Sequence, residues 1–250
     1  MVAIGVLLVA LLERVPRARF HEARLVRPYL GTDIGYLLLG YAALATPAAA
    51  WVAFAPEAWR SVAGATLPSW SRIPFAAQVG AALVALDLGN YLVHRALHRF
   101  SWLWRIHEVH HSSLHLDWAA TFRSHILEQG LRRLTAPVLL IFLGMPTEAV
   151  ASAAVMFVVW ATLDHSNLRL PLGGVEGVLV TPRLHRAHHV ASTMERNFGT
   201  VLTVWDRVFG TFEVAAGATD AVVGLPASCE PYPQTFLRQL GAPVLLRRTQ

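Results

Sequence analysis

Three short stretches decide the fold: His94-Arg-Ala-Leu-His98, His107-Glu-Val-His-His111 and His185-Arg-Ala-His-His189. Eleven of the twelve histidines lie between His94 and His189. Residues three and four apart lie on the same face of a helix, so at 3.6 residues per turn each His-x-x-His-His stretch gathers its imidazoles within roughly 100°. The stretches therefore predict helices that each present their imidazoles on one face.

Imidazole clusters of this kind favour a metal site. A single histidine is usually an interfacial residue that caps a helix or contacts a lipid phosphate, but eight at helical spacing are not explained in that way. Neutral imidazole is the commonest protein metal ligand, and it suits iron, zinc, copper and nickel. Because a tetrahedral zinc site takes three or four ligands, the count predicts two metals. The candidate ligands are His94, His98, His107, His110, His111, His185, His188 and His189, with His165 as a ninth and His125 as a further candidate.

The composition favours a membrane protein. Hydrophobic residues make up 54% of the 250 residues and charged residues 15%, whereas soluble domains have about 45–50% and about 25%. Apolar runs predict spans near 34–55 and 73–93 and a membrane hairpin over 134–164, although the apolar run 1–12 is shorter than the roughly 20 residues that cross a bilayer. We expect an all-α integral membrane bundle of about four transmembrane helices. Residues 1–93 form its N-terminal membrane part, and residues 94–250 form the histidine-rich catalytic region with a cytoplasmic helical cap, in one catalytic domain overall.

The arginines predict the orientation. The chain has no lysine, and its basic residues gather at 14–27 and at Arg95, Arg99 and Arg105, which lie on one side of a pair of spans. The positive-inside rule places both groups in the cytoplasm. We therefore expect a multi-pass protein whose histidines all lie on the cytoplasmic side.

Two other classes of function remain open. His107-Glu108-x-x-His111 also matches the H-E-x-x-H pattern of zinc proteases, with Glu108 as general base, although a protease leaves five clustered histidines without a role. A non-enzymatic metal-binding or transport protein is the other alternative, but a transporter should carry ligands deep along its spans. Nucleic-acid binding is not expected, because the basic residues flank the spans and no matching motif is present. The single cysteine, Cys229, excludes a Cys-type metal site.

These stretches, taken with their flanks, resemble the fatty acid hydroxylase and sterol desaturase superfamily of membrane histidine-box di-iron oxygenases. The resemblance runs from Asp87 to Thr211, through the boxes Asp87-x-x-x-Tyr91-x-x-His94-Arg95-x-x-His98, Leu103-Trp104-Arg105-x-His107-x-x-His110-His111 and Thr181-Pro182-x-x-His185-Arg186-x-His188-His189. Asn197-Phe198-Gly199 and Trp205-Asp206-Arg207-x-Phe209-Gly210-Thr211 are similar to its closing motif, and Arg123-x-His125-x-x-Glu128 resembles a further family segment.

The resemblance implies an oxidoreductase. The eight box histidines, joined by His165, would bind two iron ions, and the enzyme would use dioxygen to hydroxylate or desaturate a C–H bond of a lipid such as a sterol or a fatty acid. It would be a monooxygenase of lipid metabolism. Because no cytochrome b5-like domain is present, a separate reductase, ferredoxin or cytochrome would supply the electrons.

Residues outside the clusters carry further expectations. Asp87 and Tyr91 share a helix face with His94, so each is a candidate to orient an imidazole. Asp87 could instead form a helix–helix hydrogen bond, and Tyr91 could be an interfacial anchor. We expect the segment around Trp205 and Asp206 to be structural and to close through a turn at Gly210. Arg95, Arg105 and Arg186 are expected to contact headgroups or carboxylates.

Overall fold

The computed structural model describes residues 1–21, 26–40, 70–142, 144–170, 174–214, 221–229 and 231–246. Within these ranges the chain is helical, with three isolated β-bridges and no strand, which confirms the all-α prediction for this part of the chain. The longer elements are α1 (Val2–Leu12), α3 (Phe75–Arg99), α4 (Ser101–His111), α5 (Ile126–Phe142), α6 (Thr147–Asp164), α7 (Pro182–His188), α8 (Val204–Val208) and α9 (Phe236–Leu245). Short 3-10 turns cover Pro16–Ala18, Ala120–Phe122, Val175–Gly177 and Ala227–Cys229, and residues 30–40 are also helical.

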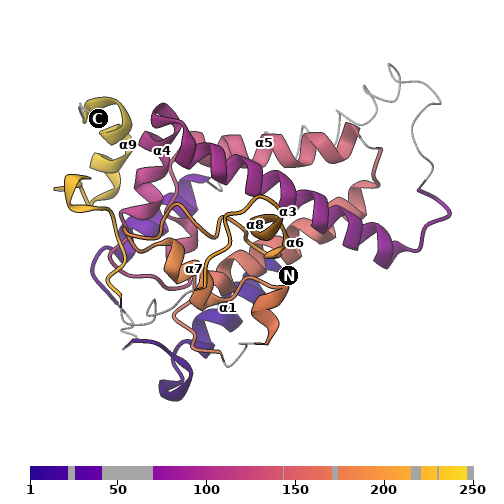
Figure 1. Cartoon of the computed structure of the whole chain (residues 1–250), viewed down its shortest axis with the longest axis horizontal. Coiled ribbons are helices and arrows are strands. Elements are labelled where there is room, and N and C mark those ends of the chain that lie inside the picture. The colour runs from indigo at the N-terminus through magenta and orange to yellow at the C-terminus, as the bar shows by residue number, and fades with distance from the viewer. Residues whose placement is uncertain are drawn as a thin grey trace.

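Helices α3, α5 and α6 run side by side and form the body of the molecule (Figure 1). Pro74 precedes α3, and Pro146 precedes α6, as expected because proline cannot continue a preceding helix but fits a helix start. Helix α3 ends where Phe100 takes an extended backbone (φ −104°, ψ 120°), and α4 begins at the next residue. This abrupt turn brings the histidines of α4 back toward those at the end of α3.

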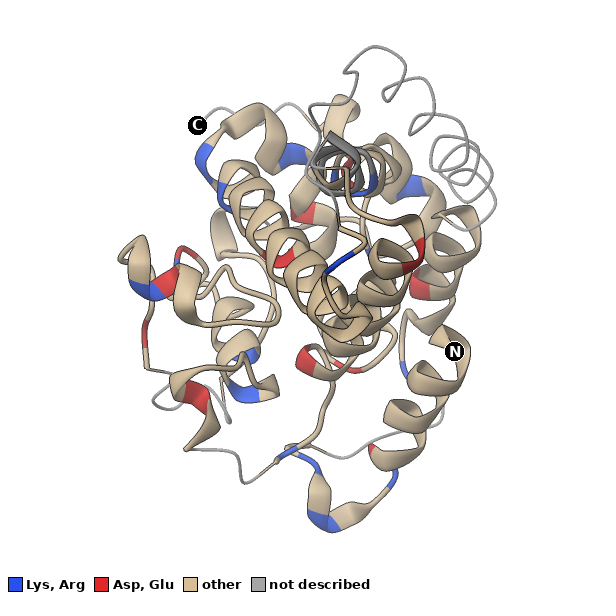
Figure 2. Cartoon of the chain, turned by 90° about the vertical axis from the view of Figure 1, so that its right-hand side faces the viewer, with Lys and Arg blue, Asp and Glu red and all other residues tan. Residues whose placement is uncertain are grey.

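Among the described residues, two helices, α3 and α6, are long and apolar enough to cross a bilayer. Each has long stretches without a charged side chain (Figure 2). Helix α3 matches the predicted span 73–93 and continues six residues beyond it, and the predicted hairpin 134–164 corresponds to α5 and α6. With 17 residues, α5 is shorter than the roughly 20 that span a bilayer. The predicted span 34–55 lies mostly outside the described residues, so the number of four spans stays a prediction.

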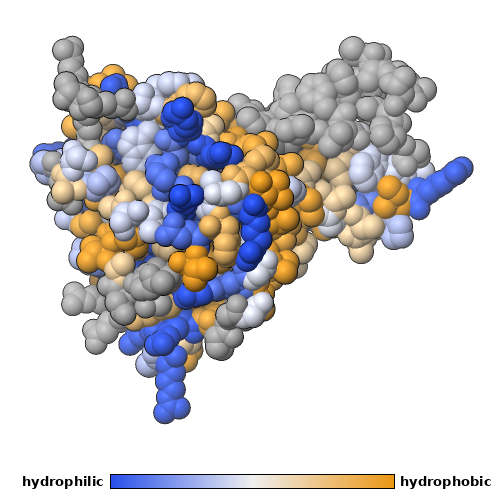
Figure 3. Space-filling view, viewed as in Figure 1, coloured by the Kyte–Doolittle hydropathy of each residue, from blue (hydrophilic) through white to orange (hydrophobic). Residues whose placement is uncertain are grey.

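The largest buried apolar cluster contains no residue next to a histidine in the chain, whereas a smaller one of Leu97, Leu103 and Ile106 lies among the histidine-bearing helices. The buried centre of the largest cluster lies between α3, α5 and α6 and is formed by Ala82, Leu86, Leu140, Val150 and Ala153. Figure 3 shows hydrophobic side chains as a band on one face of the molecule, with hydrophilic side chains mostly to its left, over the end that carries α4 and α7. The fold thus has an apolar end and a polar, histidine-bearing end.

Helix α1 packs against α6 and exposes apolar side chains on its other side. The Cβ of any residue replacing Gly5 would lie 2.5 Å from Cγ2 of Val159, so glycine allows the close approach of the two helices. Ile4, Leu7 and Leu11 are exposed. The 11 residues of α1 are too few to span a bilayer.

Candidate metal centre

The structure brings all nine expected histidines together in two buried groups. One group holds His94, His98, His107, His111 and His188, and the other holds His110, His165, His185 and His189. In each group, one ring nitrogen per histidine lies within 4.8 Å of the others. Their role as metal ligands stays a prediction, but the gathering of nine imidazoles is a property of the fold.

The two groups are interleaved on the same helices. Histidines four residues apart share a group: His107 lies with His111, and His185 lies with His189. The histidine that stands between the members of each pair belongs to the other group. The sequence pattern predicted one imidazole face per cluster, but on a helix a residue at i+3 is displaced by about 100° from one at i+4. That displacement divides each His-x-x-His-His cluster between two centres. The groups abut, since the rings of His111 and His189 stack with centroids 4.6 Å apart.

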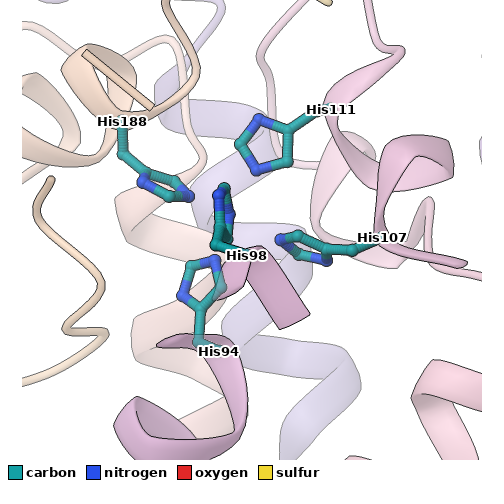
Figure 4. Close-up of side chains that lie close together, drawn as sticks. All are labelled: His94, His98, His107, His111 and His188. Carbon is teal, nitrogen blue, oxygen red and sulfur yellow. The ribbon is translucent and has the colours of Figure 1, made fainter. Parts of the chain in front are cut away.

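The first group is held from outside and leaves its inner nitrogens unpaired. Its five side chains come from α3, α4 and α7 and point toward one another (Figure 4). Backbone carbonyls accept from Nδ1 of His94 (Phe198 O, 2.9 Å) and from Nδ1 of His188 (Arg196 O, 2.7 Å). The Nε2 atoms of His94, His98, His107, His111 and His188 are buried without a hydrogen-bond partner among the described residues.

The second group brings its Nε2 atoms together directly. His165 Nε2 lies 3.1 Å from Nε2 of His110 and 3.0 Å from Nε2 of His185, which is itself 3.2 Å from Nε2 of His189. A shared proton can join two such nitrogens, but it does not account for four that converge. Nitrogens at right angles about a metal with bonds of about 2.1 Å lie about 3 Å apart, so the spacing fits a common cation.

Burial favours the neutral form of the imidazoles around α4 and α7. It lowers the pKa of His107, and it lowers the pKa values of His110, His111, His185, His188 and His189 well below the ordinary value of 6.5, with a further lowering from neighbouring histidines. Unprotonated imidazole is the form that binds a metal. A buried set of nine imidazole nitrogen donors with unpaired or converging lone pairs therefore fits two transition-metal ions and suits iron among others.

Three carboxylates contact the histidines from outside the groups. Glu128 Oε1 accepts from Nδ1 of His107 (2.9 Å), Asp164 Oδ1 lies 2.5 Å from Nδ1 of His165, and Glu195 Oε1 lies 3.4 Å from Nδ1 of His98. A carboxylate on the outer nitrogen of a ligating histidine fixes the tautomer and ring orientation and raises ligand basicity. These carboxylates thus do what the sequence analysis expected of Asp87.

Glu128 is the best placed of the three. Burial alone would raise the pKa of its carboxyl group, but the neighbouring His107 and Arg132 outweigh burial and hold that pKa well below its usual range. Oε1 also accepts from Arg132 Nε at 2.9 Å. Glu128 is therefore an anion in a buried site.

Glu128→Gln is expected to weaken iron binding about 10-fold to 100-fold, because a neutral amide orients His107 less firmly and lowers its basicity. Iron retained per chain during titration with a chelator measures this. Glu195→Gln is the matched control: its side chain is 68% exposed and its contact is longer, so its effect should be much smaller. Equal effects of the two variants would contradict the role of Glu128.

Asp87 and Tyr91 have partners other than the imidazoles we expected. The Asp87 carboxylate accepts from the backbone N–H groups of Val201 and Leu202 and from Nε1 of Trp205, each at 2.9 Å. Asp87 lies seven residues before His94, about 10 Å along the helix, which is too far for an imidazole contact. It joins α3 to the segment that precedes α8.

Tyr91 is buried, so it is not an interfacial anchor. Its hydroxyl donates to Oγ1 of Thr211 (2.8 Å), which donates to Asp206 (2.7 Å), and its ring stacks on Phe209 at 5.2 Å. Like Asp87, it joins α3 to the segment 197–211, the closing segment, rather than to a histidine.

The closing segment is structural, as expected, and it also orients His94. Asp206 accepts from the N–H groups of Phe198 (2.8 Å) and Gly199 (2.8 Å), and the Phe198 carbonyl accepts from His94. A Cβ at Gly199 would lie 2.8 Å from Oδ2 of Asp206, so only glycine fits here. Gly210 turns the chain with φ +72°, a conformation that favours glycine.

His125 and Glu108 lie outside both groups. The Nε2 atom of His125 contacts the Leu240 carbonyl (3.1 Å), and its Nδ1 accepts from Leu127 N (3.3 Å). Both ring nitrogens therefore have backbone partners, and the structure does not bring His125 to a ligand position. Glu108 is buried but is not among the side chains that converge with His107 and His111.

The sequence analysis missed most of the carboxylates that contact the histidines from outside the two groups. Glu128 had a partial signal, because it stands three residues after His125 in the segment similar to the family. Asp164 had a signal in its position directly before His165 at the end of an apolar helix. Glu195 had none, since it reaches His98 across 97 residues.

A sequence model described as fatty acid hydroxylase matches residues 79–211, more than half of the chain and all nine converging histidines. The chain belongs to the fatty acid hydroxylase family. An ornithine lipid hydroxylase of Rhizobium tropici is 30% identical over 218 residues, which cover 84% of this chain and 65% of that protein. Alkylglycerol monooxygenases of Danio rerio and Homo sapiens are 31% and 30% identical over 52% and 53% of this chain.

The chain therefore covers less than two thirds of the length of these relatives, and only 29% and 30% of the two alkylglycerol monooxygenases. No solved structure matches it. The relatives are named as hydroxylases and monooxygenases.

Proposed function

We propose that this fatty acid hydroxylase family member is a membrane-bound, non-heme di-iron oxygenase that hydroxylates or desaturates a C–H bond of a lipid. The observation that carries the proposal is the pair of abutting histidine groups, whose inner nitrogens are buried and lack ordinary hydrogen-bond partners. His94, His98, His107, His111 and His188 would hold one iron, and His110, His165, His185 and His189 would hold the other. Two irons bound there would supply dioxygen-dependent oxidation of an unactivated C–H bond.

The chain's own groups hold the ligands in place and exclude water. The carbonyls of Phe198 and Arg196 fix His94 and His188, and Glu128 fixes His107. The side chains of His107, His111 and His188 are fully buried. A buried centre of this kind protects reactive chemistry from side reactions with solvent.

A lipid substrate is supported by the relatives' names and by the apolar body beside the histidine-bearing end. The ornithine lipid hydroxylase and the alkylglycerol monooxygenases are named for lipid substrates. Helices α3 and α6 would cross the bilayer as part of a multi-pass bundle, with the histidine centre at its cytoplasmic side. Electrons would come from a separate reductase, ferredoxin or cytochrome.

The proposal is tested with protein purified in detergent from iron-supplemented cells. Metal analysis should find about two irons per chain, as two imidazole sites require. Incubation with membrane lipids, a reductant and isotopically labelled dioxygen should yield a lipid that carries the label if the reaction is hydroxylation, or a dehydrogenated lipid if it is desaturation. Lipids that remain unchanged under dioxygen, at full iron occupancy and with a competent reductant, would refute the oxygenase.

The protease alternative predicts a different outcome. Hydrolysis through His107 and His111 would require Glu108 and would proceed without dioxygen. We expect Glu108→Gln to retain about two irons and dioxygen-dependent activity. A single zinc per chain that survives His188→Ala would favour the protease instead.

A further inference from the structure

A cavity with charged, polar and apolar side chains in its wall lies against α7 at Arg186. It has a volume of about 500 Å³, within the range of small-molecule sites. Its walls come from the chain after α1, from the loop around residues 114–117, from α7 and from residues 221–223. Arg14, Arg27 and Arg186 line it together with Glu13 and Asp117.

Arg186 is the unusual member of this set. It is 3% exposed, and its Nε has no hydrogen-bond partner within the part of the chain that the structure describes. Its Nη2 makes only long contacts of 3.4 Å, to the Leu116 carbonyl and to Oδ1 of Asn167. Among the residues that the structure describes, no carboxylate oxygen lies within 4.0 Å of this guanidinium. A buried charge without a paired anion is costly, so binding of an anion beside Arg186 would be favourable.

Arg27, a second arginine in the cavity wall, is already neutralised by carboxylates. Arg27 donates to Asp117 through Nε (2.5 Å) and Nη2 (2.7 Å), and it also pairs with Asp33. Burial raises the pKa of Glu13 to about 7, so at neutral pH this carboxyl group offsets only part of the positive charge. The cavity therefore keeps a net attraction for anions beside Arg186.

The guanidinium is also held in position. Its Cζ lies 5.3 Å from the centroid of the Phe20 ring, and stacking on an aromatic ring fixes the plane of the fork. Arg186 stands between His185 and His188 on α7, and Asn167, which also lines the cavity, stands two residues after His165. Arg186 thus lies on the helix that carries one histidine of each group, although none of the nine converging histidines lines the cavity itself.

The rest of the wall suits a lipid. Leu114, Leu116, Val222 and Val223 also line the cavity, so apolar surface continues beside the polar groups. A headgroup with a short apolar continuation matches this mixture better than a fully hydrated small anion does.

We propose that Arg186 binds the anionic group, a carboxylate or a phosphate, of the substrate lipid's headgroup and thereby holds that headgroup beside the histidine centre. This rests on the proposed function in requiring a lipid substrate, and it names the class: lipids with an anionic or zwitterionic headgroup. The bond is a charge-assisted fork, for which arginine is better suited than lysine.

The test measures binding and needs no turnover. Iron-loaded protein in non-ionic detergent is titrated with dodecyl phosphate, dodecanol and inorganic phosphate by calorimetry. We expect dodecyl phosphate to bind at least about 10-fold tighter than dodecanol, and inorganic phosphate to bind more weakly than dodecyl phosphate. Arg186→Gln should abolish the preference, Arg186→Lys should retain part of it, and Arg238→Gln should retain all of it. Arg238 is the matched control because it is exposed on α9 and does not line the cavity.

Three results would overturn the proposal: no preference for dodecyl phosphate in the unaltered protein, an undiminished preference in folded Arg186→Gln, or equally tight binding of inorganic phosphate, which would assign the site to a free anion. If Arg186→Gln does not fold, Arg186→Lys decides, and an undiminished preference there counts against the fork. Because the readout is binding, a protein that binds dodecyl phosphate through Arg186 but oxidises no lipid would contradict only the proposed function.

Discussion

His188→Ala and His189→Ala are each expected to lose about one iron per chain, but from different sites. The two residues are neighbours, yet His188 converges with His94, His98, His107 and His111, whereas His189 converges with His110, His165 and His185. Because metal ions supply several kcal/mol of stabilisation to the reacting groups, loss of either should lower the oxidation rate about 100-fold or more. Elemental analysis gives the iron content, and mass spectrometry of the lipid product gives the rate.

The double variant His188→Ala/His189→Ala should retain little iron. His125→Ala is the matched control, since His125 is a buried histidine that lies outside both groups and bonds to backbone atoms; it should keep about two irons per folded chain. If His188→Ala and His189→Ala both kept full iron content, the assignment of two sites would be wrong.

Asp87→Ala is expected to lower the free energy of unfolding by about 3 kcal/mol or more, because each buried donor left unpaired costs about 1–3 kcal/mol. The carboxylate is fully buried, and it is the acceptor for three N–H groups, those of Val201, Leu202 and Trp205. Thermal unfolding in detergent measures the loss. Since the same segment carries the Phe198 carbonyl that orients His94, we also expect weaker binding of the iron in the first group, with less effect on the second.

A double-mutant cycle isolates this contact. Trp205→Phe removes one of the three donors, so Asp87→Ala should cost less in that background, and the two changes should be non-additive. Asp87→Asn keeps one acceptor oxygen and should fall between the unaltered protein and Asp87→Ala. Strictly additive effects, or equal stability of Asp87→Ala and the unaltered protein, would contradict the fastening role.

Local spacing made the helices and the converging histidines predictable, because both follow from periodicity along one element. The span over 73–93 and the helices around His107 and His185 are of this kind. Which histidines of different helices share a group could not be read from one helix, since this depends on how α3, α4, α6 and α7 pack around a common point. Asp87 was assigned to the correct helix face but to the wrong partner, because its partners lie 114 to 118 residues away in the chain.

The carboxylates that touch the histidines show the same limit. Glu195 and His98 meet only because the segment after α7 folds back over the end of α3. A charged residue in a loop carries no periodicity that would mark it. The cavity at Arg186 is likewise a product of packing, formed by segments that are distant in the chain.

The interleaving of the two groups on α4 and α7 limits how such a protein can change over time. Inserting or deleting one residue within either helix would turn its histidines by about 100° relative to the rest and would damage both centres at once. Substituting a single histidine damages only one. The two centres can therefore be changed one side chain at a time. A shift of register in α4 or α7 cannot preserve one centre and remove the other.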